Sequence, residues 1–201
     1  MRRWVLALLL LALPVSGCTT TEPGTPTSSG GTTPSSEVKP PATTVSIPPR
    51  PAVLKLDAVD PCALLTADQR GQLKVDSFRP QTNSTEIYRG AKECAFEVSA
   101  KAPYYRYYAT LVTTEGIDAW LSGKRNVDAE LVSVERYPAV QYDLAGQGAN
   151  AAPCTTSVDV ADGQQLQVRA ATSGKDFSQD QVCEMSEQAA GLALTTLKTL
   201  A

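Results

Sequence analysis

The order of apolar and polar residues divides the chain into three parts. Residues 4–13 form an unbroken apolar run, and residues 19–51 are mostly Thr, Ser, Pro and Gly with scarcely any large apolar side chain. From residue 53 onward, short stretches repeat apolar residues with the period of a strand or of a helix. These patterns predict one folded domain over residues 53–201, of about 150 residues, which is enough for a single core.

Helical spacing predicts three helices in this domain, at residues 60–73, 116–121 and 180–200. The first has Asp60 as a candidate cap and Pro61 at the first helical position, where proline is favoured. The last is amphipathic and turns four residues toward the core: Cys183, Ala190, Leu194 and Leu197.

Alternating or β-branched stretches predict strands at residues 93–98 and 104–114, and on both sides of a turn near Pro138 within residues 129–144. The clearest hairpin covers residues 154–172, with Asp162-Gly163 as the tight-turn pair. The order helix, strands, helix predicts an α+β fold, in which an antiparallel β-sheet packs against the N-terminal and C-terminal helices.

The N-terminus has the layout of a secretory signal. Arg2 and Arg3 precede the apolar run, which is too short for a membrane span of roughly 20 residues. The next residues, Val15-Ser16-Gly17-Cys18, resemble the bacterial lipobox, in which the cysteine thiol receives a diacylglyceryl group with acyl chains such as palmitate and becomes residue one after cleavage. The alternative is an ordinary secretory signal that is cut nearby, with Cys18 as a bystander.

The lipobox predicts three segments and an address. Residues 1–17 are then a lipoprotein signal peptide, and residues 18–52 are the lipidated Cys18 followed by a disordered linker, because such a polar segment cannot bury enough surface to fold. Residues 53–201 are the domain. We expect the protein on the extracytoplasmic face of the cell membrane, held by its N-terminal lipid.

The cysteine count agrees with this address. Of five cysteines, Cys18 goes to the lipid, and an exported protein is expected to oxidise the other four into disulfides: Cys62, Cys94, Cys154 and Cys183. We favour Cys62–Cys94 with Cys154–Cys183, since each bridge would join a helix start to a strand. The rival pairing is Cys62–Cys183 with Cys94–Cys154.

Four stretches together resemble a known family. "DPCALLT" opens the domain, "ECAFEV" and "APCTTSVDV" follow on strands, and "QVCEMSEQAAGLALTTL" forms the last helix. In these the chain is similar to small actinobacterial lipoproteins of domain-of-unknown-function family 3558. The resemblance implies a lipoprotein address and a disulfide-stapled α/β domain, and it implies no activity.

The composition argues against catalysis. The chain has no histidine, which removes the commonest general base and the commonest metal ligand, and oxidised cysteines cannot bind zinc as thiolates. We therefore expect no enzyme activity, no cofactor and no metal. The net charge of −3 and the lack of a basic patch also argue against a nucleic-acid partner.

One aromatic cluster is a candidate binding patch. In "PYYRYY", Tyr104, Arg106 and Tyr108 share one face of a strand, while Tyr105 and Tyr107 share the other face with the core. Tyr and Arg are enriched at interfaces, although these tyrosines would also serve simply to cover a sheet edge with Arg106 stacked on them.

The sequence thus predicts a non-catalytic binding or accessory module at the cell envelope, whose partner is an unknown envelope protein or a small ligand. The alternatives are a carrier of a small hydrophobic ligand, which would need an apolar cavity, or a hydrolase that works through two carboxylates.

Overall fold

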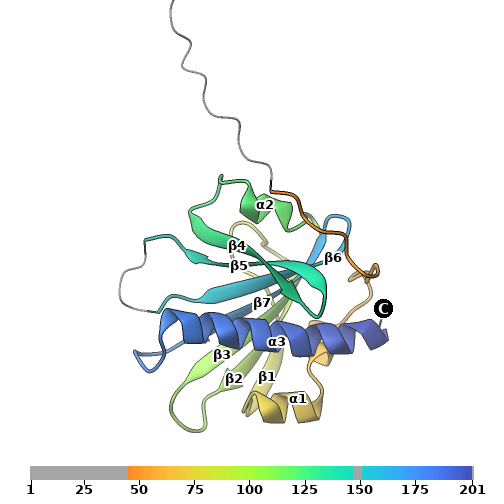
Figure 1. Cartoon of the computed structure of the whole chain (residues 1–201). Coiled ribbons are helices and arrows are strands. Elements are labelled where there is room, and N and C mark those ends of the chain that lie inside the picture. Colours follow the sequence, from red (N-terminus) through yellow and green to blue (C-terminus); the bar gives the residue numbers. More distant parts are fainter. Residues whose placement is uncertain (1–44, 147–150, 201) are drawn as a thin grey trace, which may run out of the picture. The chain divides into compact units, whose positions relative to one another are not determined.

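The computed structural model describes residues 45–146 and 151–200, which form one α+β unit (Figure 1). Seven strands make a single antiparallel sheet, and one long helix lies across one of its faces. The predicted fold class is confirmed. Cys18 and most of the predicted linker lie outside the described residues. Within the described residues, no helix is long and apolar enough to cross a membrane.

The sheet has the strand order β1-β2-β3-β7-β6-β5-β4. The strands are β1 (Ser77–Thr82), β2 (Lys92–Val98), β3 (Tyr105–Val112), β4 (Val127–Val134), β5 (Tyr137–Leu144), β6 (Cys154–Ala161) and β7 (Gln164–Thr172). Two sequential groups, β1-β2-β3 and β4-β5-β6-β7, are joined by the pairing of β3 with β7. The aromatic strand β3 thus lies beside β7, which is the second strand of the hairpin predicted over residues 154–172.

In the described part of the chain, four helical segments accompany the sheet: the 3₁₀ turn η1 (Pro61–Leu64), α1 (Ala67–Gln72), α2 (Asp118–Leu121) and α3 (Gln179–Leu200). The prediction of one continuous helix over residues 60–73 is wrong, because the helix is interrupted at Leu65, which has extended backbone angles. Thr66 then begins α1 with a capping box: its side chain accepts from the N–H of Gln69, and the Gln69 side chain accepts from the N–H of Thr66.

The main core lies between α3 and the sheet face that it covers, which we call the first sheet face. Tyr105 and Tyr107 lie on this face and are buried, as predicted. On α3, Ala190, Leu194 and Leu197 are buried against the sheet, and Cys183 is half-buried. The sheet contributes mainly the apolar residues of β2, β3, β6 and β7 to this layer, which holds the scaffold together.

Two disulfides fasten the helical layer to the sheet. Cys62 in η1 is bonded to Cys94 on β2, and Cys183 in α3 is bonded to Cys154 on β6. These are the pairs that the sequence analysis favours, and each joins a helical segment to a strand. The rival pairing is wrong.

The second sheet face carries a smaller core. Tyr88 from the β1–β2 connection and Ile117 and Trp120 from the β3–β4 connection pack on Val140 and Tyr142 of β5. Loops and the single turn of α2 therefore cover part of this face, where no long helix lies (Figure 1). The two faces of the sheet are built differently, and the candidate site lies on this second face.

Two local features lack a clear signal in the sequence. The turn between β4 and β5 lies at Glu135-Arg136, two residues before Pro138, and the backbone angles φ of the pair are +49° and +71°. Left-handed turn pairs are normally Asn-Gly or Asp-Gly, so this pair gives no turn signal. Strand β1 is not predicted at all, because its sequence SFRPQT is polar, contains Pro80 and pairs only with β2 at the sheet edge.

The chain before residue 53 also contacts the domain. The Arg50 Nε–H donates to Oδ2 of Asp159 at 3.0 Å, and its terminal nitrogens donate to Asp162 at 2.9 Å. Ile47 packs against the smaller core. Residues 47–50, which the sequence analysis assigns to the linker, thus lie on the domain, and Asp159 of β6 and Asp162 of the following turn hold Arg50 there.

Replacing Arg50 with glutamine is expected to lower the free energy of unfolding by about 1–2 kcal/mol at neutral pH. Asp159 has a pKa raised by burial, an effect that the positive charge of Arg50 opposes. When folding raises the pKa of a carboxyl, the folded protein loses stability as the pH rises through that pKa. Without the charge of Arg50, the pKa of Asp159 would be raised further, so this loss would be larger in the variant. The difference between Arg50→Gln and wild type should therefore grow from about pH 3 to pH 7 in urea titrations.

The matched control is Asp162→Asn, because the Asp162 carboxylate is 99% exposed and should contribute less than about 0.5 kcal/mol. A loss that is the same at all pH values would contradict the role of Arg50 as the counter-charge of Asp159.

Candidate ligand-binding hollow

The second sheet face has an unusual lining of buried polar side chains. Gln165 is fully buried, and Glu93, Thr155 and Gln167 are each less than 10% exposed. The Glu93 carboxylate accepts hydrogen bonds from Thr110 on the neighbouring strand and from Asn83 in the loop that covers it. Buried polar groups are retained when they are hydrogen-bonded, so this face is a fixed polar surface rather than a defect.

A hollow with a volume of about 480 Å³ opens on this face. Its floor is aromatic and consists of Tyr88, Trp120 and Tyr142, and we call it the aromatic hollow. Ligand pockets of small molecules commonly have volumes of about 300–1,000 Å³, with mostly apolar walls and a few polar groups. The aromatic hollow has this size and this composition.

The aromatic floor is rigid because its rings are stacked. Tyr142 lies on one face of Trp120 with ring centroids 3.8 Å apart, and the Arg125 guanidinium lies 4.0 Å from the Trp120 centroid. The indole N–H donates to Oε1 of Gln165 at 3.0 Å. Trp120 is thereby fixed by two stacking partners and one hydrogen bond.

A charged cluster holds Arg125 at the floor. Its guanidinium donates to both carboxylate oxygens of Glu115, at 2.6 and 2.9 Å, and the Tyr88 hydroxyl donates to the same carboxylate. Gln165 also donates to the Tyr88 oxygen at 3.1 Å. Burial raises the pKa of Tyr88, and the hydrogen bond to Glu115 raises it further, so Tyr88 stays a neutral donor at physiological pH.

Tyr142 brings a hydroxyl into the same hollow. Its oxygen accepts a hydrogen bond from Gln167 at 2.8 Å, and burial raises its pKa, so that this hydroxyl also stays protonated. Thr155 lies beside it, because Tyr142 and Thr155 are paired across β5 and β6. Thr155 in turn is paired with Arg169 on β7.

Apolar side chains form the rim of the aromatic hollow. Ile87 and Leu144 are 53% and 49% exposed, and both line the opening, together with Val127 and Pro153. When a ligand covers large apolar side chains that are half exposed to water, the burial of their apolar surface stabilises the complex. Their gathering around one hollow distinguishes it from scattered exposed residues, which need no explanation.

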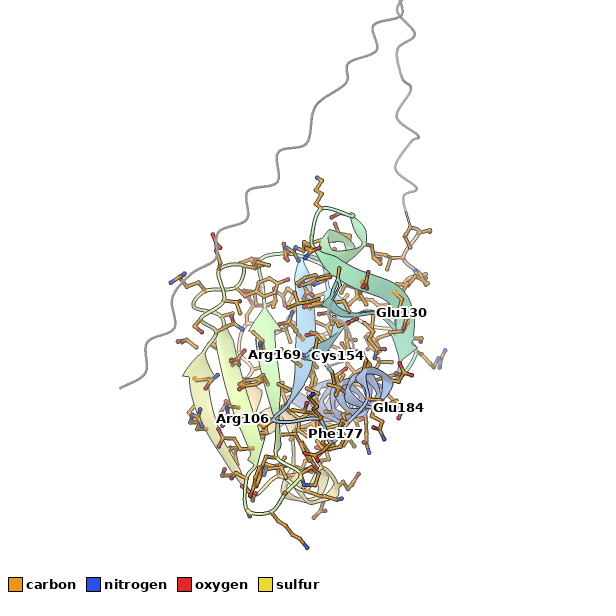
Figure 2. All side chains as sticks on the ribbon, turned by 90° about the vertical axis from the view of Figure 1, so that its left-hand side faces the viewer. Arg106, Glu130, Cys154, Arg169, Phe177 and Glu184 are labelled. Atoms are coloured by element: carbon orange, nitrogen blue, oxygen red, sulfur yellow. A yellow bond between two sulfur atoms is a disulfide. The ribbon has the colours of Figure 1, made fainter. Side chains whose placement is uncertain are left out.

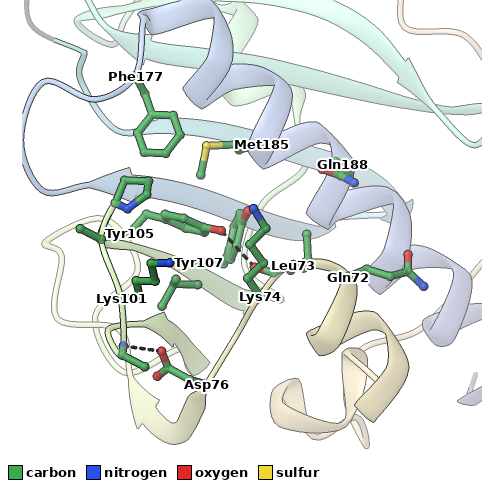
Figure 3. A pocket seen from close by; sticks show the side chains of 14 residues that line it. Gln72, Leu73, Lys74, Asp76, Lys101, Tyr105, Tyr107, Phe177, Met185 and Gln188 are labelled. Atoms are coloured by element: carbon green, nitrogen blue, oxygen red, sulfur yellow. Dashed lines mark hydrogen bonds between the residues drawn. The ribbon is translucent and has the colours of Figure 1, made fainter.

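A second hollow lies on the helix side of the sheet, with a volume of about 520 Å³ (Figure 3). Tyr105, Phe177 and Met185 line it, and the exposed Lys74 and Lys101 lie at its edge. Its one carboxylate, Asp76, already accepts hydrogen bonds from Ser99 and from the Ala100 N–H, which lower its pKa.

Comparison with protein families identifies the chain. Residues 13–196 match the family described as "Protein of unknown function (DUF3558)". The chain belongs to this family. No curated protein and no solved structure matches it. The match confirms the predicted domain-of-unknown-function family, and Cys18 lies within the matched residues.

The predicted patch of this DUF3558 protein is only partly a free surface. Tyr104 is 48% exposed, while Arg106 is 3.5 Å from a carboxylate oxygen of Glu97. Tyr108 is half-buried and carries Arg169 over its ring at 4.3 Å, so the stacked cation is Arg169 and not Arg106. Figure 2 shows Arg106 and Arg169 on the side of the sheet away from α3, which carries Glu184. The patch thus continues toward the aromatic hollow through Tyr108 and Arg169.

Asp128 and Asp143 are cross-strand partners on β4 and β5, and the pKa of Asp143 is raised by burial and then by the charge of Asp128. They stand side by side on one sheet surface, whereas a glycosidase places its two acids on either side of the scissile bond. Among the described residues, no three side chains gather in a way that could hold a metal ion.

Sequence reasoning missed the aromatic hollow because its walls come from segments far apart in the chain. A partial signal was present in "QQLQVR" (164–169), where Gln165, Gln167 and Arg169 alternate with buried Leu166 and Val168. Such alternation predicts a polar second face, but it does not say that the glutamines are covered.

Proposed function

We propose that this protein is a lipid-anchored module of the cell envelope that binds a small molecule in the aromatic hollow without catalysing a reaction. The anchor is Cys18 in the lipobox Val15-Ser16-Gly17-Cys18, and the linker allows the domain to stand clear of the lipid headgroups. The two disulfides fit an oxidising compartment outside the cytoplasm.

The observation that carries the binding function is the aromatic hollow itself. It combines a rigid stacked floor, hydroxyl and amide groups that converge on one side, and exposed apolar residues at the rim. A rigid, preformed pocket binds with a small loss of conformational freedom. This favours a small ligand over an extended protein surface, which would use the exposed Tyr104 and Arg106.

Trp120 offers a direct reporter of this hollow. The chain has two tryptophans, and Trp4 lies in the predicted signal peptide, so the chain from Thr19 onward contains Trp120 alone. We expect decanol, an uncharged apolar probe, to change the Trp120 fluorescence in a saturable way. The double variant Ile87→Asp/Leu144→Asp should bind decanol at least about tenfold more weakly, because two apolar contacts are lost.

The matched control is Val53→Asp, since Val53 is 59% exposed and does not line the hollow. All three proteins should unfold at the same urea concentration, because each substitution is at an exposed position. If the rim variant binds decanol as wild type does, or if no saturable signal is seen, the ligand does not enter this hollow and the proposal is wrong.

A further inference from the structure

We propose that the ligand of the aromatic hollow carries an anionic group, a carboxylate or a phosphate, that Arg169 binds, while its apolar body covers the aromatic floor and rim. This inference rests on the proposed binding function and adds the chemical class of the ligand. It follows from the positions and the partners of Arg106, Arg125 and Arg169.

Two of these arginines already have anionic partners. Arg125 is bound by both carboxylate oxygens of Glu115 and lies on Trp120, so its role is to hold the floor. Arg106 has Glu97 beside it at 3.5 Å. In each case a carboxylate of the domain itself lies within ion-pair distance of the guanidinium.

Arg169 differs from both. It is half-buried and lines the hollow, with its guanidinium held over the ring of Tyr108 at 4.3 Å. Within residues 45–146 and 151–200, Arg169 forms no ion pair and donates no side-chain hydrogen bond. A guanidinium stays charged at every physiological pH and offers five N–H donors in a planar fork that fits a carboxylate or a phosphate.

The register of the sheet places Arg169 beside the polar side of the floor. Tyr142, Thr155, Arg169 and Tyr108 are successive partners across β5, β6, β7 and β3, and so they form one row on this face. Neighbouring strands are about 4.8 Å apart, which puts Arg169 two strands, or roughly 10 Å, from Tyr142. An anion at Arg169 would thus have the Thr155 hydroxyl on its Tyr142 side.

One carboxylate also lines the hollow and limits where an anion can bind. Asp143 follows Tyr142 on β5 and precedes Leu144 at the rim. Its negative charge would repel a ligand anion near the rim formed by Leu144. The anionic group is therefore expected at the Arg169 side, with the apolar body directed toward Leu144 and Val127.

The test compares decanoate with decanol, which share an apolar chain and differ in charge, by Trp120 fluorescence of the chain from Thr19 onward at pH 7. Wild type should bind decanoate at least about tenfold more tightly than decanol, because hydrogen bonds between charged groups are strong. Arg169→Gln should lose this preference and bind the two probes with similar affinity, while its urea midpoint stays that of wild type, which shows that the domain is intact.

The matched control is Arg106→Gln, which removes a positive charge from the same sheet face outside the hollow and should keep the wild-type preference. If wild type binds both probes equally, or if Arg106→Gln removes the preference as fully as Arg169→Gln, the anionic class is wrong while binding in the hollow stands. If neither probe binds wild type, the proposed function itself is wrong, and this inference is overturned with it.

Discussion

Removing both disulfides is expected to lower the free energy of unfolding by about 6 kcal/mol and to leave the domain largely unfolded at 37 °C. The bridges span 32 and 29 residues. A bridge that closes a loop of this length stabilises the fold by about 3 kcal/mol, because it lowers the conformational entropy of the unfolded chain. Domains of this size are stable by only about 5–15 kcal/mol. The measurement is urea unfolding of the variant in which the four cysteines are alanine.

The two single-bridge variants separate the contributions. Cys62→Ala/Cys94→Ala frees η1 from β2, and Cys154→Ala/Cys183→Ala frees the start of α3 from β6. Each should lower the free energy of unfolding by about 3 kcal/mol. If the four-alanine protein has the urea midpoint of wild type, the bridges do not stabilise this fold.

Replacing Cys18 with alanine is expected to move most of the protein from the membrane fraction to the soluble exported fraction. In the proposed lipid anchor the Cys18 thiol is the acceptor of the diacylglyceryl group, so alanine would leave no attachment point. Two acyl chains bind a bilayer firmly, at about 0.8 kcal/mol per buried CH₂. Fractionation of cells followed by immunoblotting measures the distribution.

The matched control is Ser16→Ala, which keeps a small residue in the lipobox and should leave the protein in the membrane fraction. Metabolic labelling with a palmitate analogue should mark wild type and Ser16→Ala but not Cys18→Ala. If Cys18→Ala stays in the membrane fraction in the wild-type proportion, the lipid-anchor proposal fails.

The two sheet faces explain how one small domain combines stability with a site. The face under α3 is apolar, is fastened by both disulfides and supplies most of the buried core. The other face is polar and aromatic, with hydrogen-bonded glutamines beneath Trp120 and Tyr142. Sites are most precise when rigid elements carry them, and here the rigid elements are β5, β6 and β7.

The sequence predicts the elements whose signals are local. The hairpin over residues 154–172 was predictable because Asp162-Gly163 separates two alternating strands, and in the structure Gly163 has φ of +67° at that turn. The burial of Tyr105 and Tyr107 followed from strand alternation alone. The last helix was predictable from its apolar stripe, which the structure places against the sheet.

The remaining features depend on contacts that the sequence does not display. Strand β1 exists because β2 offers it a partner, since its own residues are polar and exposed. Arg50 is ordered by Asp159 and Asp162, which lie more than 100 positions further along the chain. The aromatic hollow needs the β1–β2 connection, the α2 region and β5 to meet, so no single stretch contains its pattern.

The measurement that tests the central claim most directly is native mass spectrometry of the chain from Thr19 onward, exported by its own host and purified without detergent. The account predicts a reproducible added mass of a few hundred daltons on wild type, and the protein mass alone for Ile87→Asp/Leu144→Asp. Wild type with the protein mass alone, or the same added mass on both proteins, would contradict a small ligand bound in the aromatic hollow.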